Sequence, residues 1–414
     1  MKNSKTTNGE PKLKNYSKTT VKKCNRLLLP VLFGSLRLYY YLRGVRVKKT
    51  VKCGSQPQGP AIVLCNHGSF IDFIYAGALV YKSRPSFVVA RLYFYHRLLG
   101  WMLRNVGCFP KSMFALDMES TKNCLRVLQE GRILAMMPEA RLSTAGRFED
   151  IQPGTYSFLK KCKVPVYTIK LQGDYLANPK WGKGPRRGAL VEAEMDLLFT
   201  AQQVQELSLE EIRQGVEQRL YYDEFQWLET RPHVRYRNRR IAEGLENILT
   251  ICPVCKKKYT ITTRNNAVCC SHCGQLTTIN DRYGFQADFC FAHLGQWYDW
   301  QLEQMKQEIL SDPDYRLVSP VELRLPGQGD ALTRSAGQGV CTLTRSGLRY
   351  EGTKDGETVQ LEFSIQQIYR LLFGAGENFE VYSGSEIHYF VPENKQSSVD
   401  WYMASMILND AVAQ

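Results

Sequence analysis

A histidine and an aspartate follow a strand-like apolar run in the first third of the chain. The run Ala61–Cys65 leads into Asn-His-Gly-Ser-Phe-Ile-Asp, so that His67 precedes Asp72 by five residues. Within one ideal helix this spacing would place the two side chains about 140° apart. They meet only if His67 lies in the turn, where Gly68 frees the backbone, and Asp72 lies in the first helical turn. A neutral imidazole could then accept a proton while the carboxylate fixes its tautomer. A structural alternative stays open, because Ser69 and Asp72 also resemble a capping box.

Four cysteines form a second constellation with a different chemistry. Cys252-Pro-Val-Cys255 is followed, after fourteen intervening residues, by Cys270-Ser-His-Cys273. Two such turns at this separation are close to the spacing of a zinc ribbon, one residue short of the usual range. In such a ribbon four thiolates close a tetrahedral structural site. We therefore expect structural zinc at Cys252, Cys255, Cys270 and Cys273. Cys269 is an alternative to Cys270, His272 is a weaker one, and a cluster of reduced thiols is the structural alternative.

Three further blocks follow the histidine block in order. They are Ala90-Arg91 with Leu99-Gly100-Trp101 and Gly107-Cys108-Phe109-Pro110, then Met137-Pro138-Glu139-Ala140-Arg141-Leu142-Ser143, and then Val164-Pro165-Val166. Together with Asn-His-x4-Asp, the series resembles the glycerolipid acyltransferases, the 1-acylglycerol-3-phosphate (lysophosphatidic acid) acyltransferase family. The likeness covers residues 55–230 and implies the α/β fold of that family. It also implies transfer of a fatty acyl group from acyl carrier protein or acyl-CoA to a lysophospholipid hydroxyl in phospholipid biosynthesis.

The resemblance also implies roles for individual residues. His67 would be the general base on the acceptor hydroxyl and Asp72 its orienting partner, with no covalent acyl-enzyme. The acceptor headgroup would be held by basic and acidic side chains of the second and third blocks, because a guanidinium fork suits a phosphate. These candidates are Glu139, Arg141, Arg91 and Lys111. For Glu139 a helix-start acid, and for Arg91 a snorkelling side chain, are the alternatives.

Both headgroup blocks depart from the family pattern. The basic residue of the third block, Arg141, comes one place early, and Met113 stands where the second block usually has an arginine. The His67/Asp72 pair is intact. We therefore expect acyl transfer to be retained, with lysophosphatidic acid as the leading acceptor and another lysolipid or an amphipathic alcohol as the alternative.

The elements that must position these residues alternate between strand-like and helical patterns, which predicts an α/β domain with a largely parallel sheet. Strands are expected at 61–65, 86–90, 133–137, 164–171 and 189–194, and helices at 70–80, 95–105, 120–130, 154–161 and 209–228. The domains expected are a disordered basic tail (1–23), an amphipathic membrane-associating helix (24–50), the acyltransferase domain (51–230) and the zinc ribbon (248–285). After a helical link (294–310) comes a small β-rich domain (316–414), which resembles a β-sandwich or pleckstrin-homology domain closed by a C-terminal helix (399–408).

The positive charge is concentrated at the N-terminus. The chain has 54 Lys and Arg against 40 Asp and Glu, and +12 of the net +14 lies in residues 1–50. The apolar segment 27–42 is shorter than the ~20 residues that span a bilayer. Basic flanks and three tyrosines favour attachment to one leaflet of an anionic membrane, with packing of this helix on its own domain as the alternative.

Compartment and partners follow from cysteine usage and charge. Thirteen cysteines, an odd number, and a polar N-terminus favour a reducing, cytoplasmic setting, peripheral or monotopic on the inner face of the cell membrane. The nearly neutral remainder of the chain argues against nucleic acid, although the basic stretch 231–240 beside the ribbon keeps a nucleic-acid binder as an alternative. A catalytically inactive lipid- or partner-binding protein is the other alternative.

Overall fold

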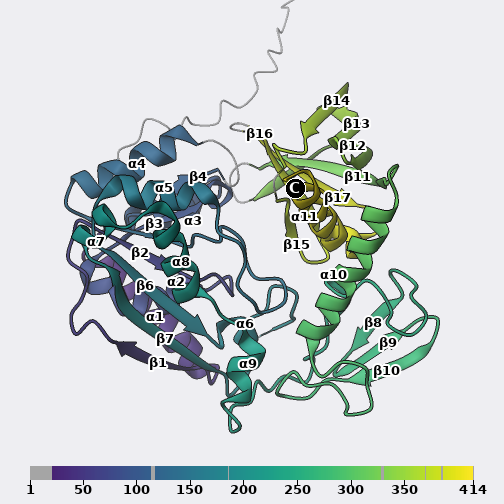
Figure 1. The fold of residues 1–414 in the computed structure, drawn as a ribbon, viewed down its shortest axis with the longest axis horizontal. Helices are drawn as coiled ribbons and strands as arrows, with labels where there is room; N and C mark the ends of the chain where they lie inside the picture. The colour runs from purple at the N-terminus through teal and green to yellow at the C-terminus, as the bar shows by residue number, and fades with distance from the viewer. Residues whose placement is uncertain are drawn as a thin grey trace, which may run out of the picture.

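The computed structural model describes residues 21–112, 117–184, 186–327, 331–368, 370–383 and 386–413. Most of the tail expected at 1–23, and Met113, lie outside these residues. The described chain forms an α/β layer, a small three-stranded sheet and a seven-stranded antiparallel sheet (Figure 1). The long helix α10 (Leu294–Ser311) runs between the three-stranded sheet and the antiparallel seven-stranded sheet.

The α/β layer is built on a seven-stranded sheet with the order β1-β7-β6-β2-β5-β3-β4. All neighbouring strands are parallel except β6 and β7, as predicted for a largely parallel sheet. The central strand β2 is buried at all five positions, which explains its unbroken apolar sequence. The strands are β1 (Arg46–Val51), β2 (Ala61–Cys65), β3 (Ser86–Ala90), β4 (Phe109–Lys111), β5 (Ile133–Met136), β6 (Val166–Gln172) and β7 (Leu190–Phe199).

Helices lie along and around this sheet. Five predicted strands and the helices after them are found within a few residues of the expected positions. The helices are α1 (Leu28–Leu42), α2 (Asp72–Val80), α3 (Arg97–Asn105), α4 (Met118–Gln129), α5 (Pro153–Cys162), α6 (Asp174–Ala177), α7 (Ala201–Glu206), α8 (Leu209–Leu220) and α9 (Glu224–Glu229), with short 3-10 turns η2 (Tyr81–Ser83), η3 (Arg91–Phe94) and η4 (Leu245–Asn247).

Two helix predictions need correction. The segment 24–50 is not one helix, because α1 ends at Leu42 and residues 46–51 form β1, which pairs with β7. The single helix predicted at 209–228 is two helices. Asp223 interrupts it, since its carboxylate accepts hydrogen bonds from the backbone N–H of Phe225 and Gln226 and thereby caps α9.

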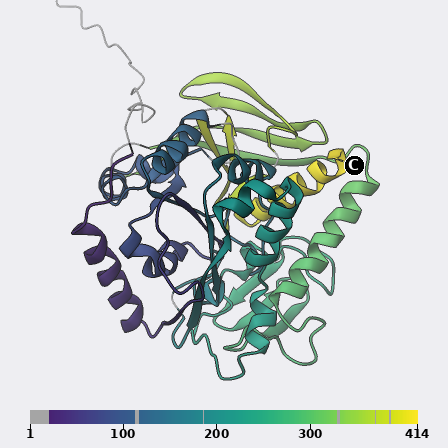
Figure 2. The same cartoon turned by 60° about the vertical axis from the view of Figure 1, so that its left-hand side comes forward.

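The helix α1 lies on the outer surface of the α/β layer, at the far side from α11 (Figure 2). Leu29 and Phe33 are buried, whereas Val31, Leu38, Tyr41 and neighbouring apolar side chains are exposed. Of the helices in the described ranges, none has the length and apolarity to cross a membrane.

The chain continues into two β-rich parts. The three-stranded antiparallel sheet contains β8 (Ile261–Arg264), β9 (Ala267–Cys270) and β10 (Gly274–Thr278). The C-terminal sheet has the order β14-β13-β12-β11-β17-β16-β15, and α11 (Ser398–Ala413) packs against it, as predicted for a β-rich domain with a closing helix. Its elements are β11 (Leu317–Pro326), β12 (Thr333–Thr344), β13 (Gly347–Lys354), β14 (Glu357–Ser364), β15 (Leu372–Gly374), β16 (Asn378–Ser383), β17 (Glu386–Pro392) and η5 (Lys395–Ser397).

One continuous hydrophobic core joins the three parts. It extends from Val63 in β2 through Trp297 in α10 to Trp401 in α11, and all three side chains are at most 1% exposed. Polar contacts reinforce this junction, since the Tyr402 hydroxyl donates to Glu149 (2.9 Å) and Thr250 donates to Asp400 (2.8 Å). The C-terminal sheet is therefore packed onto the α/β layer rather than tethered to it.

Candidate active site

The turn after β2 brings His67 and Asp72 together. Asn66 anchors this turn to β6, because its side-chain amide donates to the Leu171 carbonyl and its side-chain oxygen accepts the Leu171 N–H. His67 lies in the turn and Asp72 is the first residue of α2. Nδ1 of His67 is 2.9 Å from Oδ2 of Asp72, as expected from the sequence. The Asp72 carboxylate also accepts the Ser69 N–H, but Ile71 is the N-cap of α2 and no side-chain cap bond forms, so the structure does not contain the capping box considered from the sequence.

The surroundings hold the His67 ring in its neutral form. Burial, with a smaller contribution from the Lys180 ammonium, lowers the pKa of His67 to about 4. With Nδ1 directed at Asp72, the other ring nitrogen, Nε2, is left for a substrate. A neutral imidazole in this tautomer is the form that can accept a proton.

Behind the pair lies a row of buried carboxyl groups that sequence inspection missed. Asp174, at the start of α6, lies close enough to Asp72 and Glu224 for the three groups to affect one another's pKa, and all three side chains are fully buried. Burial raises the pKa of each carboxyl group. Gly68 makes room for this row, because a Cβ there would lie 2.5 Å from Oδ2 of Asp174.

The Glu139 side chain contacts the backbone of the turn that carries His67. Its side chain is fully buried, one carboxylate oxygen accepts the His67 N–H (2.8 Å), and the other accepts the Glu149 N–H (2.9 Å). The Ser143 N–H in turn donates to the His67 carbonyl (2.9 Å). Both oxygens of Glu139 are thus occupied in joining the histidine turn to the segment after β5. Its contacts are those of a positioning residue, whereas we had predicted a headgroup ligand.

Arg141 reaches the same region from the third block. Its Nε donates to Oε2 of Glu149 (2.9 Å), and its guanidinium lies 5.6 Å from the ring centre of Tyr402 in α11. Oε1 of Glu149 accepts the Thr144 N–H, so Glu149 links the loop, the arginine and the C-terminal helix. Arg141 also lines the cavity described next, as a headgroup candidate should.

A cavity of about 1440 Å³ opens beside His67. Its apolar lining comes from α1, α2, α3 and β3, with Leu29, Phe33, Phe87, Met102 and Val106 among the residues that form it. The polar lining includes Arg141, Lys111 and Lys180 from the α/β layer and Glu380 from the C-terminal sheet. Sequence analysis missed Lys180 and Glu380.

Arg91 is directed elsewhere. Its guanidinium pairs with Asp117 (3.1 Å), which also caps α4 by accepting the Ser120 N–H. Arg91 is absent from the cavity lining, whereas Lys111 is present in it. Of the four headgroup candidates, the structure therefore brings Arg141 and Lys111 to the cavity with His67, and not Glu139 or Arg91.

The four cysteines of the ribbon also come together. The Sγ atoms of Cys252, Cys255, Cys270 and Cys273 lie within 4.8 Å of one another, and those of Cys255 and Cys270 are 3.8 Å apart. Tetrahedral zinc with Zn–S bonds of about 2.3 Å requires sulfur separations of this size. The N–H groups of His272 and Cys273 donate to the Sγ of Cys270, and Cys269 is outside the group. The donor set therefore fits zinc.

Comparison with known proteins finds likenesses to part of the α/β layer. Residues 46–172 match the Acyltransferase family model, and the resemblance drawn from the sequence blocks is confirmed. Over 127 residues, 30% of this chain, it is 28% identical to a chloroplastic 1-acyl-sn-glycerol-3-phosphate acyltransferase of Arabidopsis thaliana and 26% identical to one of Brassica napus.

The matched region is limited. The chain spans 35% and 36% of the length of these two relatives. The crystal structure of a 1-acyl-sn-glycerophosphate acyltransferase from Thermotoga maritima is 20% identical, with a TM-score of 0.35, and the match covers 46% of this chain and 74% of that one. The zinc ribbon and the C-terminal sheet lie outside the family match.

Proposed function

We propose that the protein transfers a fatty acyl group from a thioester, acyl-CoA or acyl carrier protein, to the hydroxyl of a lysophospholipid. The observation that carries this proposal is the neutral His67 ring, bonded to Asp72 through Nδ1 and lining the large cavity. Lysophosphatidic acid is the reference acceptor, because the Arabidopsis and Brassica relatives are named for 1-acyl-sn-glycerol-3-phosphate.

The reaction needs one proton relay and no covalent enzyme intermediate. Nε2 of His67 takes the proton of the acceptor hydroxyl while the oxygen attacks the thioester carbonyl. The carbon–sulfur bond then breaks, and the leaving thiolate takes the proton back from His67. Asp72 keeps the tautomer and stabilises the imidazolium that forms between these steps. The apolar wall from α1–α3 suits an acyl chain, and Arg141 with Lys111 suits a phosphate.

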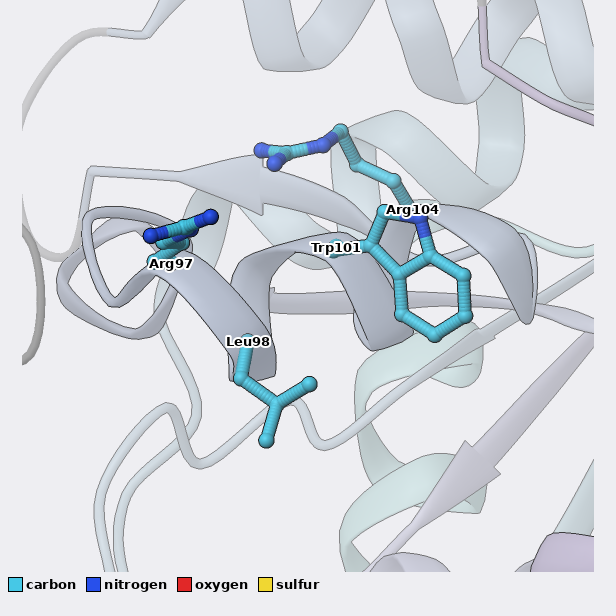
Figure 3. A pocket seen from close by; sticks show the side chains of 4 residues that line it. All are labelled: Arg97, Leu98, Trp101 and Arg104. Atoms are coloured by element: carbon cyan, nitrogen blue, oxygen red, sulfur yellow. The ribbon is translucent and has the colours of Figure 1, made fainter.

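A membrane partner is supported by exposed apolar residues on two helices. Leu98 and Trp101 extend from one side of α3, while the guanidinium groups of Arg97 and Arg104 extend from another (Figure 3). Leu98 is 68% exposed and Trp101 54%, and the exposed face of α1 adds Val31 and Tyr41. Apolar and basic groups together favour the interface of an anionic bilayer, from which a lysolipid would enter. These residues support the proposed peripheral attachment to the inner face of the cell membrane.

Structural zinc belongs to the same proposal. We infer that the four cysteines bind one zinc ion, which would hold together the turns before β8 and after β9. In a part with few core residues, such an ion supplies folding energy directly. No reaction step involves it.

The proposal is tested with purified, zinc-loaded protein, anionic vesicles, each acyl donor and a panel of lysolipids, with the products detected by mass spectrometry. We expect diacyl product from the wild type and a loss of at least about 100-fold in His67→Ala. His233→Ala, at an exposed position, is the matched control and should retain full activity. Vesicle binding without product from any donor would reject the proposal and favour an inactive lipid-binding protein.

A further inference from the structure

Two opposite charges face the cavity from different parts of the chain. Lys180 follows α6 in the α/β layer, and Glu380 lies in β16 of the C-terminal sheet. The Lys180 ammonium is 3.4 Å from the ring centre of Phe373 in β15. Within the part of the chain that the structure describes, neither charge has an ion-pair partner within 4.0 Å, although each lies in the electrostatic field of the other.

Enclosing a charge without an oppositely charged group in direct contact is costly, and the pKa values of both groups are shifted accordingly. Burial lowers the pKa of Lys180 to about 7 and raises the pKa of Glu380 to about 7. In a direct ion pair, the attraction would move the two pKa values the other way. The pair is thus separated, and each charge is left for a ligand that enters the cavity.

The two charges have different neighbours. Lys180 shares its end of the cavity with His67 and with Arg141, whose guanidinium is paired with Glu149. Lys180 therefore brings an ammonium group beside the reacting nitrogen. Around Glu380 the walls are aromatic. Tyr382 donates a long hydrogen bond to it (3.4 Å), and Tyr93 and Tyr389 lie near enough to feel its charge. An acidic group among aromatic rings is a suitable environment for an ammonium ion.

From these contacts we propose that the C-terminal sheet completes the acceptor site and selects a zwitterionic lysophospholipid. This inference rests on the proposed acyl transfer and refines its acceptor. The phosphate lies against Lys180 and Arg141, next to the hydroxyl that His67 activates. A primary ammonium group attached beyond the phosphate, as in lysophosphatidylethanolamine, lies against Glu380.

The same arrangement disfavours a bare phosphate monoester. Lysophosphatidic acid would bring up to two negative charges to Lys180 and Arg141, and its headgroup would offer no ammonium group to the Glu380 carboxylate. Opposed like charges in an enclosed site are repulsive. Glu380 would therefore act against lysophosphatidic acid and in favour of the ammonium headgroup.

The test compares initial rates with lysophosphatidylethanolamine and lysophosphatidic acid of equal chain length, in vesicles of fixed composition. We expect the wild type to prefer the ethanolamine acceptor by at least about 10-fold in kcat/KM. Glu380→Gln should lower that value at least about 30-fold and raise the value for lysophosphatidic acid, which reverses the preference. Lys180→Met should lower both. Glu386→Gln, an exposed glutamate of the neighbouring strand β17, should leave both unchanged.

A binding measurement separates this inference from the reaction itself. By calorimetry, sn-glycero-3-phosphoethanolamine should bind the wild type more tightly than sn-glycerol 3-phosphate does, and Glu380→Gln should abolish that difference. This binding result together with an absence of turnover would reject the proposed acyl transfer and support the proposed headgroup site. Two results would overturn the inference and leave the proposed acyl transfer intact. In the first, both lysolipids are acylated and Glu380→Gln lowers kcat/KM equally for both. In the second, the two soluble headgroups bind the wild type with equal affinity.

Discussion

Glu139 provides a test of whether a residue of the third block binds substrate or holds the catalytic turn. In Glu139→Ala the backbone N–H groups of His67 and Glu149 lose their buried acceptors, at about 1–3 kcal/mol each. Part of this loss is offset, because burial raises the pKa of Glu139 and its carboxylate is costly to enclose. We expect a net loss of about 2–4 kcal/mol in the free energy of unfolding.

The expected activity loss follows from the same two hydrogen bonds. Since His67 is held through its backbone N–H, freeing the turn displaces the imidazole, and a misplacement of about 1 Å can cost about 100-fold in rate. Glu139→Gln should not rescue the variant, because an amide oxygen can accept one N–H while the amide nitrogen faces the other. kcat should therefore fall in both variants, with little change in the KM for the lysolipid.

The assay pairs thermal unfolding with steady-state kinetics. At about 2–4 °C per kcal/mol, the midpoint should fall by at least about 4 °C in Glu139→Ala. Glu210→Ala serves as the control, since Glu210 also accepts side-chain hydrogen bonds but lies on the surface of α8. An unchanged unfolding midpoint together with a raised lysolipid KM would refute this reasoning and restore Glu139 as a headgroup ligand.

Three further predictions concern the base, the metal and the membrane. Because the pKa of folded His67 is lowered to about 4 from 6.5, the acidic limb of the pH profile of kcat/KM should lie below pH 6, and a limb at or above pH 6.5 would contradict the assignment. For the same reason, the contribution of His67 to the free energy of unfolding should be lost as pH falls from 6.5 to 4. The purified protein should contain one zinc ion per chain by elemental analysis, and Cys255→Ser should lower the metal content and the unfolding midpoint, whereas Cys269→Ser should retain both. Trp101→Glu should weaken binding to anionic vesicles at least about 10-fold in a sedimentation assay. Leu209→Glu, at an exposed position of α8, is the control and should bind like the wild type. Equal vesicle binding by the two variants would exclude α3 from the membrane contact.

The parts of the site that sequence analysis predicted are those set by short-range spacing. His67 and Asp72 are joined by one turn, and each pair of zinc-ligand cysteines is joined by a two-residue turn. Local geometry therefore determines which of these side chains come into contact. The strand and helix positions of the α/β layer were predictable for the same reason. Buried strands are short apolar runs, and a helix follows each of them at a regular interval.

The contacts that sequence analysis missed arise where distant segments meet. For Glu139 the blocks show the residue type and not the backbone N–H groups that its carboxylate accepts. Lys180 and Glu380 stand two hundred residues apart with no motif around either, so only the packing of the C-terminal sheet places them at one cavity. The strand β1 was missed because its lysines and arginine read as a basic flank of the preceding helix.

The hydrogen bond between Tyr402 and Glu149 has a consequence for the timing of synthesis. The two residues are 253 positions apart, and Glu149 in turn positions Arg141 and the loop beside His67. At translation rates of about 5–20 residues per second, the ribosome delivers Tyr402 roughly 13–50 s after Glu149. During that interval the nascent acyltransferase domain lacks one wall of its cavity and one support of its catalytic loop. The proposed acyl transfer therefore requires the last helix to have been made.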